Sequence, residues 1–111
     1  MINLATIEEF VMRYLFKDGS ECYDCIQVEN SLVLSQDKQT IRATLKSKIS
    51  NINLNPFDIV LTIKDNKLWI KSDFFEDASA LYPLRIYSND DEYILVAEFS
   101  TEVMYLHVEC S

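Results

Sequence analysis

The spacing of apolar residues changes at Gly19, and this change limits the possible folds more than any other feature of the chain. Beyond Gly19, apolar and polar side chains mostly alternate, as in half-buried β-strands. The plainest case is a pair of segments, 57–64 and 67–72, that flank Asp65-Asn66. This dipeptide tolerates the positive φ angles of a tight hairpin, and a two-residue loop sets the register. The predicted pairs are Ile63 with Leu68, Leu61 with Ile70, Thr62 with Trp69 and Val60 with Lys71.

Before Gly19 the spacing is that of a helix. Thr6 and Glu9 fit a capping box, and the apolar residues that follow recur at three- and four-residue intervals. These residues are Ile7, Phe10, Val11, Tyr14 and Leu15. Gly19 falls where a left-handed residue often ends a helix. We therefore predict a helix over about residues 6–17.

Further strands are predicted along the rest of the chain, at residues 22–28, 32–35, 84–88, 93–99 and 102–110. Residues 40–50 alternate as a strand does, but Ile41, Leu45 and Ile49 are also four apart, so strand or helix stays open over residues 38–50 and strand is favoured. Residues 73–82 are expected to form a short helical turn or a loop before Pro83.

These elements together predict an α+β fold. One N-terminal helix packs on a twisted, mainly antiparallel sheet of about six or seven strands, and a single domain covers residues 1–111. The N-terminus lacks the pattern of a signal peptide, and no apolar run approaches the roughly 18–20 residues of a membrane span. We therefore expect a cytoplasmic protein, not associated with a membrane, whose cysteines are reduced.

Charge is divided along the chain into three blocks. Residues 1–37 carry a net charge of −5, residues 38–71 carry +5 and residues 72–111 carry −8. Nucleic-acid-binding domains are generally basic, so the total of −8 argues against nucleic acid as a partner. A strongly acidic C-terminal third instead favours a basic protein partner, because summed charge steers association and rejects like-charged surfaces. The basic middle block is interpreted as a solvated face or as protection of a strand edge.

Aromatic residues accompany the acidic ones, a combination typical of protein-binding surfaces. The candidate partner-binding residues are Asp73, Glu76, Asp77, Tyr87, Asp90, Asp91, Glu92, Tyr93 and Trp69. The alternative is that the acidic loops keep the domain soluble while the aromatic side chains fill its core.

Catalytic and metal-binding motifs are weak by comparison. Cys22, Cys25, His107 and Cys110 have the composition of a zinc site, but residues three apart in a strand point to opposite faces. His107 is the only histidine and has no evident orienting partner, and one glycine cannot build a phosphate-binding loop. We therefore expect no metal, no cofactor and no enzymatic activity.

In size and charge the chain resembles the immunity proteins that protect bacteria from their own toxins, such as contact-dependent inhibition nucleases and bacteriocins. The resemblance rests on Asp73, Glu76 and Asp77, on Asp90-Asp91-Glu92, and on the tyrosines near them. It implies a tight complex with a basic toxin domain, in which carboxylates replace nucleic-acid phosphates or pair with lysines and arginines around the cleft. The basic block at 38–71 departs from a uniformly acidic inhibitor.

Two other classes stay open. A structural or adaptor subunit of a larger assembly, such as a phage or secretion-system component, would form a homo-oligomer through an exposed strand edge. A small enzyme or ligand-binding domain would need a pocket lined by His107 or the cysteines. Under the favoured hypothesis the protein itself is a monomer or a homodimer.

Overall fold

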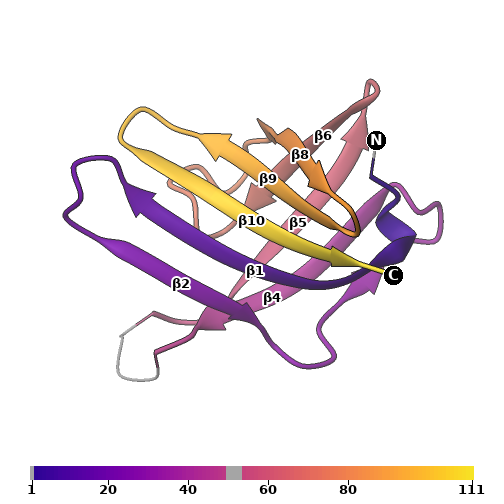
Figure 1. Cartoon of the computed structure of the whole chain (residues 1–111), viewed down its shortest axis with the longest axis horizontal. Coiled ribbons are helices and arrows are strands. Elements are labelled where there is room, and N and C mark those ends of the chain that lie inside the picture. The colour runs from indigo at the N-terminus through magenta and orange to yellow at the C-terminus, as the bar shows by residue number, and fades with distance from the viewer. Residues whose placement is uncertain (1, 50–53) are drawn as a thin grey trace.

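The computed structural model describes residues 2–49 and 54–111, and its regular secondary structure is almost entirely β-strand (Figure 1). A single 3-10 turn, η1 (Leu4–Thr6), precedes the strands. The strands are β1 (Ile7–Phe16), β2 (Cys22–Gln27), β3 (Val33–Leu34), β4 (Thr40–Ser47), β5 (Phe57–Lys64), β6 (Lys67–Ser72), β7 (Tyr82–Pro83), β8 (Arg85–Asn89), β9 (Glu92–Glu98) and β10 (Glu102–Cys110). No helix in the described part of the chain is long and apolar enough to cross a membrane.

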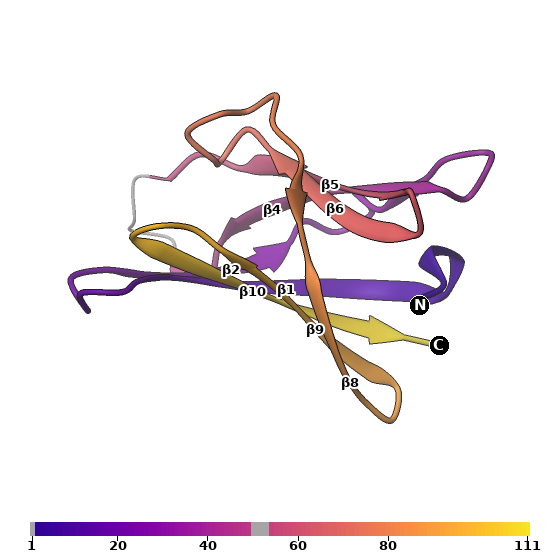
Figure 2. The same ribbon diagram turned by 90° about the horizontal axis from the view of Figure 1, so that it is seen from above.

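The strands form one antiparallel sheet that curls into a nearly closed barrel. Its order is β7-β6-β5-β4-β2-β1-β10-β9-β8, and β3 pairs with β4 outside this path. The segment Tyr82–Asn89 runs from one edge of the sheet to the other, because β7 pairs with β6 and β8 pairs with β9. Between them the Leu84 N–H donates to the Leu68 carbonyl at 3.0 Å. Figure 2 shows β4, β5 and β6 on one side of the barrel and β1, β2, β9 and β10 on the other.

The barrel therefore has two ends, and successive connections alternate between them. We call one the Gly19 end; it holds the connections at residues 17–21, 73–81 and 99–101. The other, the Asp90 end, holds the tight turns at residues 65–66 and 90–91 together with the C-terminus (Figure 1).

The predicted α+β fold is wrong, because residues 7–16 form strand β1 and not a helix. β1 pairs with β2 on one side and with β10 on the other. Phe10, Met12 and Tyr14 alternate into the interior, each at most 9% exposed. An irregularity between Ile7 and Glu9 lets Ile7 point inward as well, which produces the misleading three-residue interval.

The residues predicted to begin and end a helix, Thr6 and Gly19, have other roles in the barrel. Asn3, not Thr6, caps the short η1 turn, and its side chain accepts a hydrogen bond from the Ala5 N–H at 3.0 Å. Gly19 has a φ of +79° and lies in the β1–β2 turn, where its N–H donates to the Phe16 carbonyl at 2.9 Å. The left-handed conformation of Gly19 was thus predicted correctly, but it forms the turn between two strands and does not end a helix.

Most predicted strands are confirmed. The β5–β6 hairpin has the predicted register, and Asp65 and Asn66 have φ values of +54° and +60°. Residues 38–50, for which strand or helix was left open, contain strand β4 (Thr40–Ser47). Residue 50, where that prediction ended, lies outside the described residues. Residues 73–81 form a loop held by turns such as Phe75 N–H to the Ser72 carbonyl at 3.2 Å.

Inward side chains from all sides of the barrel form one core. The largest fully buried side chains are Phe10, Leu4, Met12, Ile41, Leu45, Ile59, Leu61, Leu68, Ile70, Leu95, Met104 and Leu106. In β10 the inward set includes Met104, Leu106 and Val108. Because the interior is filled with side chains, the surfaces available for function are the outer faces and the two ends.

Candidate functional site

The predicted acidic groups do not lie together. Asp90, Asp91 and Glu92 are in and beside the β8–β9 turn at the Asp90 end, whereas Asp73, Glu76 and Asp77 are in the β6–β7 loop at the Gly19 end. The segment Tyr82–Asn89 separates them, because it traverses the barrel from one end to the other. The two groups therefore cannot form one compact site.

Two carboxylates of the β6–β7 loop help to hold the loop. Asp73 accepts a hydrogen bond from the Asp58 N–H at 2.9 Å. Asp77 accepts from the Ser79 hydroxyl at 2.8 Å and the Ser79 N–H at 3.0 Å, and these bonds lower the pKa of Asp77. Glu76 is exposed at the Gly19 end.

The three predicted aromatic residues differ in orientation. Tyr87 points outward on β8 and is 53% exposed. Tyr93 pairs with Val108, and its partly buried side chain packs against the core. Trp69 lies on the outer face of β6, half-buried, and its indole N–H donates to the Lys64 carbonyl at 3.0 Å.

The outer face of β2, β1, β10, β9 and β8 carries four of the eight exposed large apolar side chains in the described residues: Val11, Tyr87, Ile94 and Tyr105. His107 of β10 pairs with Val11 of β1 and with Ile94 of β9, which makes them neighbours in one row across the sheet. Val11 is 41% exposed, Ile94 38% and Tyr105 39%. These side chains line a groove of about 560 Å³, which we call the outer-face groove; its lining is Val11, Met12, Arg13, Asp24, Cys25, Ile26, Lys48, Ile94, Tyr105 and His107.

An ion pair fixes one wall of the outer-face groove. Arg13 of β1 donates two hydrogen bonds to Asp24 of β2, at 2.8 and 3.3 Å. This bidentate contact keeps the Arg13 guanidinium in one orientation, and it raises the pKa of Arg13. The planar guanidinium is thus held in place beside the apolar side chains of the groove.

A row of carboxylates borders the groove toward the Asp90 end. Glu109 of β10 lies opposite both Glu9 of β1 and Glu92 of β9. We call the set Glu8, Glu9, Asp90, Asp91, Glu92 and Glu109 the acidic rim; five of its members line a hollow of about 490 Å³ at the β8–β9 turn. Within the described residues, no lysine or arginine forms an ion pair with the acidic rim, and Glu92 lies 4.0 Å from His107.

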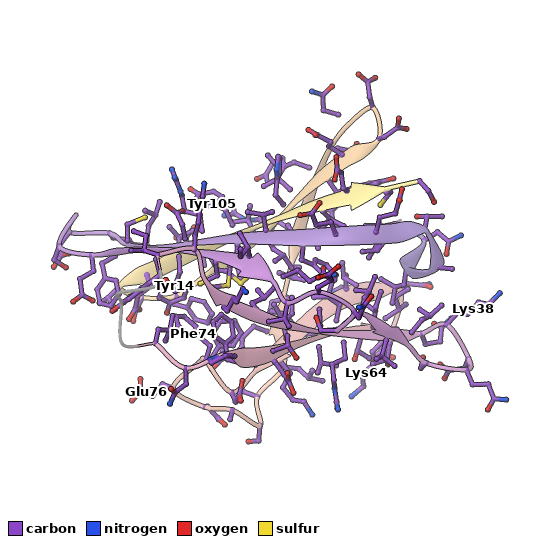
Figure 3. The ribbon with its side chains drawn as sticks, turned by 90° about the horizontal axis from the view of Figure 1, so that it is seen from below. Tyr14, Lys38, Lys64, Phe74, Glu76 and Tyr105 are labelled. Atoms are coloured by element: carbon purple, nitrogen blue, oxygen red, sulfur yellow. The ribbon has the colours of Figure 1, made fainter. Side chains whose placement is uncertain are left out.

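The opposite half of the barrel is basic. β4, β5 and β6 are neighbours in the sheet, so the basic block of the sequence becomes one continuous surface. Its outward cations are Arg42, Lys46, Lys64, Lys67 and Lys71. Figure 3 shows Tyr105 on one side of the barrel and Lys38 and Lys64 on the other.

Sequence reasoning missed most of the outer-face groove and half of the acidic rim. Glu8, Glu9 and Val11 were assigned to a helix, and Ile94 and Tyr105 were not among the candidate partner-binding residues. A signal was present: Phe10, Met12, Tyr14 and Phe16 alternate, which leaves Glu9, Val11 and Arg13 on the outer face of a strand.

The cysteines and His107 do not converge. Cys25 is buried in the interior, and this burial raises its pKa to about 11. Cys22 is exposed toward the Gly19 end, while Cys110 is at the Asp90 end. Across residues 2–49 and 54–111, no group of three or more histidine, cysteine or acidic side chains has a geometry that could hold a metal ion.

Comparison with known proteins supports the fold alone. No protein-family model matches this chain, and no curated protein matches it. Among solved structures, it is similar to a de novo designed fluorescence-activating β-barrel, with a TM-score of 0.62 and 11% identity over the full length of both chains. The shared feature is therefore the barrel architecture.

Proposed function

We propose that this protein is a protein-binding module that docks a basic partner on the outer-face groove and the acidic rim. The observation that carries the proposal is that exposed apolar side chains and carboxylates occupy adjacent rows of one sheet face: Val11, His107 and Ile94 form one row, and Glu9, Glu109 and Glu92 form the next. An apolar centre beside a charged margin is the usual anatomy of a protein interface.

The two parts of this surface have different tasks in the proposed complex. Burial of Tyr105, Val11 and Ile94 contributes affinity, because removing apolar surface from water is favourable by about 25 cal/mol per Å². The acidic rim contributes selectivity and speed, because it attracts basic surfaces and repels acidic ones. Raising NaCl from about 50 to about 500 mM is expected to slow association more than it speeds dissociation.

The class of partner follows from charge and from the resemblance to immunity proteins. A nuclease toxin must present basic side chains to its nucleic acid, and the acidic rim is complementary to such a surface. In this form of the proposal the module, acting in the cytoplasm, inhibits the toxin by covering its basic cleft or a surface next to it. Addition of the purified protein would then abolish cleavage of nucleic acid by the captured partner.

The decisive experiment compares matched variants of the two barrel halves. The partner is isolated at low salt from the cells that make the protein, and its affinity for each variant is measured by calorimetry. Val11→Ser and Glu109→Lys are each expected to weaken binding at least about tenfold, which corresponds to about 1.4 kcal/mol.

The control variants change a valine and a charged residue outside the proposed docking surface. Val33→Ser alters a valine that is 59% exposed on β3, and Lys71→Glu reverses a charge on the basic half. Both are expected to leave affinity within about twofold of the unchanged protein. An acidic partner, or equal affinity for all four variants, would refute the proposal.

A second candidate function rests on the incomplete closure of the barrel. β8 pairs with β9, and within the described residues the structure gives it no partner on its other side. All five residues of β8 are exposed, so this edge is open to another strand. If the protein is an assembly subunit, Ser88→Pro should convert a concentration-dependent homo-oligomer into a monomer in analytical ultracentrifugation. A wild-type monomer at all concentrations would eliminate this candidate.

A further inference from the structure

A further cavity lies at the Gly19 end, away from the outer-face groove and the acidic rim. It has a volume of about 370 Å³ and lies between the β6–β7 loop and the β9–β10 turn. Four aromatic and three acidic residues contribute to its lining: Tyr14, Phe75, Tyr82 and Phe99, and Glu76, Glu98 and Glu102. This composition points to a ligand that is both apolar and positively charged.

The aromatic wall is fixed by packing. Phe75 comes from the β6–β7 loop and is only 5% exposed. Its ring centroid lies 5.5 Å from that of Tyr82 and 5.1 Å from that of Phe99, and the Tyr82 and Phe99 centroids are 4.9 Å apart. Figure 3 shows Tyr14 and the neighbouring loop residues Phe74 and Glu76 at this end of the barrel. The wall therefore offers preorganised ring surfaces, which attract cations electrostatically.

The hydroxyl of Tyr14 is the unusual polar group of this cavity. Tyr14 is 9% exposed, and its hydroxyl forms no hydrogen bond with any described residue. No polar side-chain atom in the described residues is fully buried without a partner, so the Tyr14 oxygen keeps some accessible surface, and Tyr14 lines the cavity. A nearly buried hydroxyl in this position gains from a ligand that can hydrogen-bond with it.

The carboxylates leave the cavity negative. Glu98 is neutralised by Lys17 at 3.0 Å and by Arg85 at 3.1 Å. Neither Glu76 nor Glu102 forms an ion pair within residues 2–49 and 54–111, and Glu102 accepts a hydrogen bond from the Thr101 hydroxyl at 2.5 Å. An anionic ligand would be repelled, and a neutral one would leave these charges without a partner.

We propose that this cavity binds a small organic cation with a primary ammonium group on an aliphatic body. The three ammonium N–H groups can donate to the Tyr14 hydroxyl oxygen and to the carboxylates of Glu76 and Glu102. The aliphatic body packs against the aromatic wall, where the charge also gains from the ring faces. The site is separate from the proposed docking surface, so a result that refutes one proposal leaves the other standing.

The test is a titration with n-butylammonium chloride, followed by ¹H–¹⁵N NMR shifts of Ser100, Thr101 and the β6–β7 loop. A ligand of this size is expected to bind in the range of about 1–50 mM. n-Butanol has the same body without the charge, and NaCl supplies the ionic strength in matched samples. Butylammonium is expected to bind at least about fivefold more tightly than butanol.

Variants connect the binding to the proposed groups. Tyr14→Phe and Glu102→Gln should each weaken butylammonium binding by about threefold or more, while Glu109→Gln at the Asp90 end should not change it. Retained chemical-shift dispersion and melting temperature show that each variant is folded. Equal binding of butanol and butylammonium, no shifts at the highest concentration, or unchanged binding to both cavity variants would overturn the proposal.

Discussion

The two outer faces of this barrel have the same strand geometry but opposite surface chemistry. On β4, β5 and β6 the outward positions are largely charged or hydroxyl-bearing, as at Arg42, Thr44 and Lys46. On β1, β9 and β10 they carry exposed apolar side chains next to carboxylates. Among the described residues, the β4–β6 face has no exposed large apolar side chain, whereas the β1–β9–β10 face exposes Val11, Ile94 and Tyr105. The difference is why the docking proposal is placed on β1, β9 and β10.

The first prediction separates folding from binding within β1 and carries the largest expected effect. Met12 is 1% exposed in the core, and its neighbour Val11 is 41% exposed on the outer-face groove. Met12→Ala should lower the free energy of unfolding by about 2–5 kcal/mol, because it leaves a cavity. Val11→Thr should change it by no more than about 0.5 kcal/mol.

Urea unfolding at neutral pH measures both values. If Val11→Thr were as destabilising as Met12→Ala, Val11 would belong to the core, and the contrast between the inner and outer positions of β1 would collapse. A small effect on unfolding together with weaker partner binding would assign Val11 to the interface.

Local turn residues explain which parts of the fold could be predicted from the sequence. In the β5–β6 hairpin, Val60 and Trp69 also point outward, so the alternation is incomplete, but the Asp65-Asn66 turn indicated the strands and their register. In β1, the outward Val11 and Leu15 fill in the apolar pattern and mimic a helical stripe. The error arose because Thr6, Glu9 and Gly19 fit the ends of a helix and the outward Val11 and Leu15 completed a helical spacing.

Contacts between strands that are distant in the sequence were the other part of the fold that could not be predicted. The tight turn at Asp90-Asp91 and the exposed Tyr87 belong to one local hairpin, which sequence patterns can indicate. The acidic rim also needs Glu8 and Glu9, which join it only because β1 pairs with β10 across nearly the whole chain. Alternation alone does not specify that pairing, since any two strands with one apolar face could form it.

The second prediction compares the buried side chains behind the two outer faces. The interior of β4–β6 is mainly aliphatic, but β1 and β2 place Tyr14 and Cys25 inside the barrel. Burial is the main cause that raises the pKa of Tyr14 from 10.0 to about 12 and that of Cys25 from 9.0 to about 11. Both groups ionise more readily in the unfolded chain. Stability is therefore full below about pH 9 and is lost from there up to about pH 12.

Chemical denaturation at about pH 8 and about pH 11, with reductant present, measures this loss. It should amount to at most about 2–3 kcal/mol for each group, since one pKa unit corresponds to about 1.4 kcal/mol. The double variant Tyr14→Phe, Cys25→Ala is expected to lose less stability over this range than the unchanged protein. An equal loss in both proteins would mean that other groups govern the alkaline transition.

The third prediction concerns like charges that face each other across strands, and its effect is the smallest. Glu109 lies opposite both Glu9 and Glu92, whereas on the basic half Lys67 lies opposite Lys64 alone. Like charges in directly opposed positions are destabilising, by up to ~1 kcal/mol. Glu109→Gln should therefore stabilise the fold by a few tenths of a kcal/mol (~0.3–0.8), and Lys67→Gln by less.

Both gains should shrink in about 1 M NaCl, where charges are screened beyond about 3 Å. A binding site explains why such repulsion is retained: the carboxylates weaken the free fold slightly and are relieved when a basic partner covers them. If Glu109→Gln stabilises the protein and also weakens partner binding, the acidic rim is kept for recognition. If it stabilises without any effect on binding, the rim is a solvated surface like the basic half, and the two faces differ only in the sign of their charge.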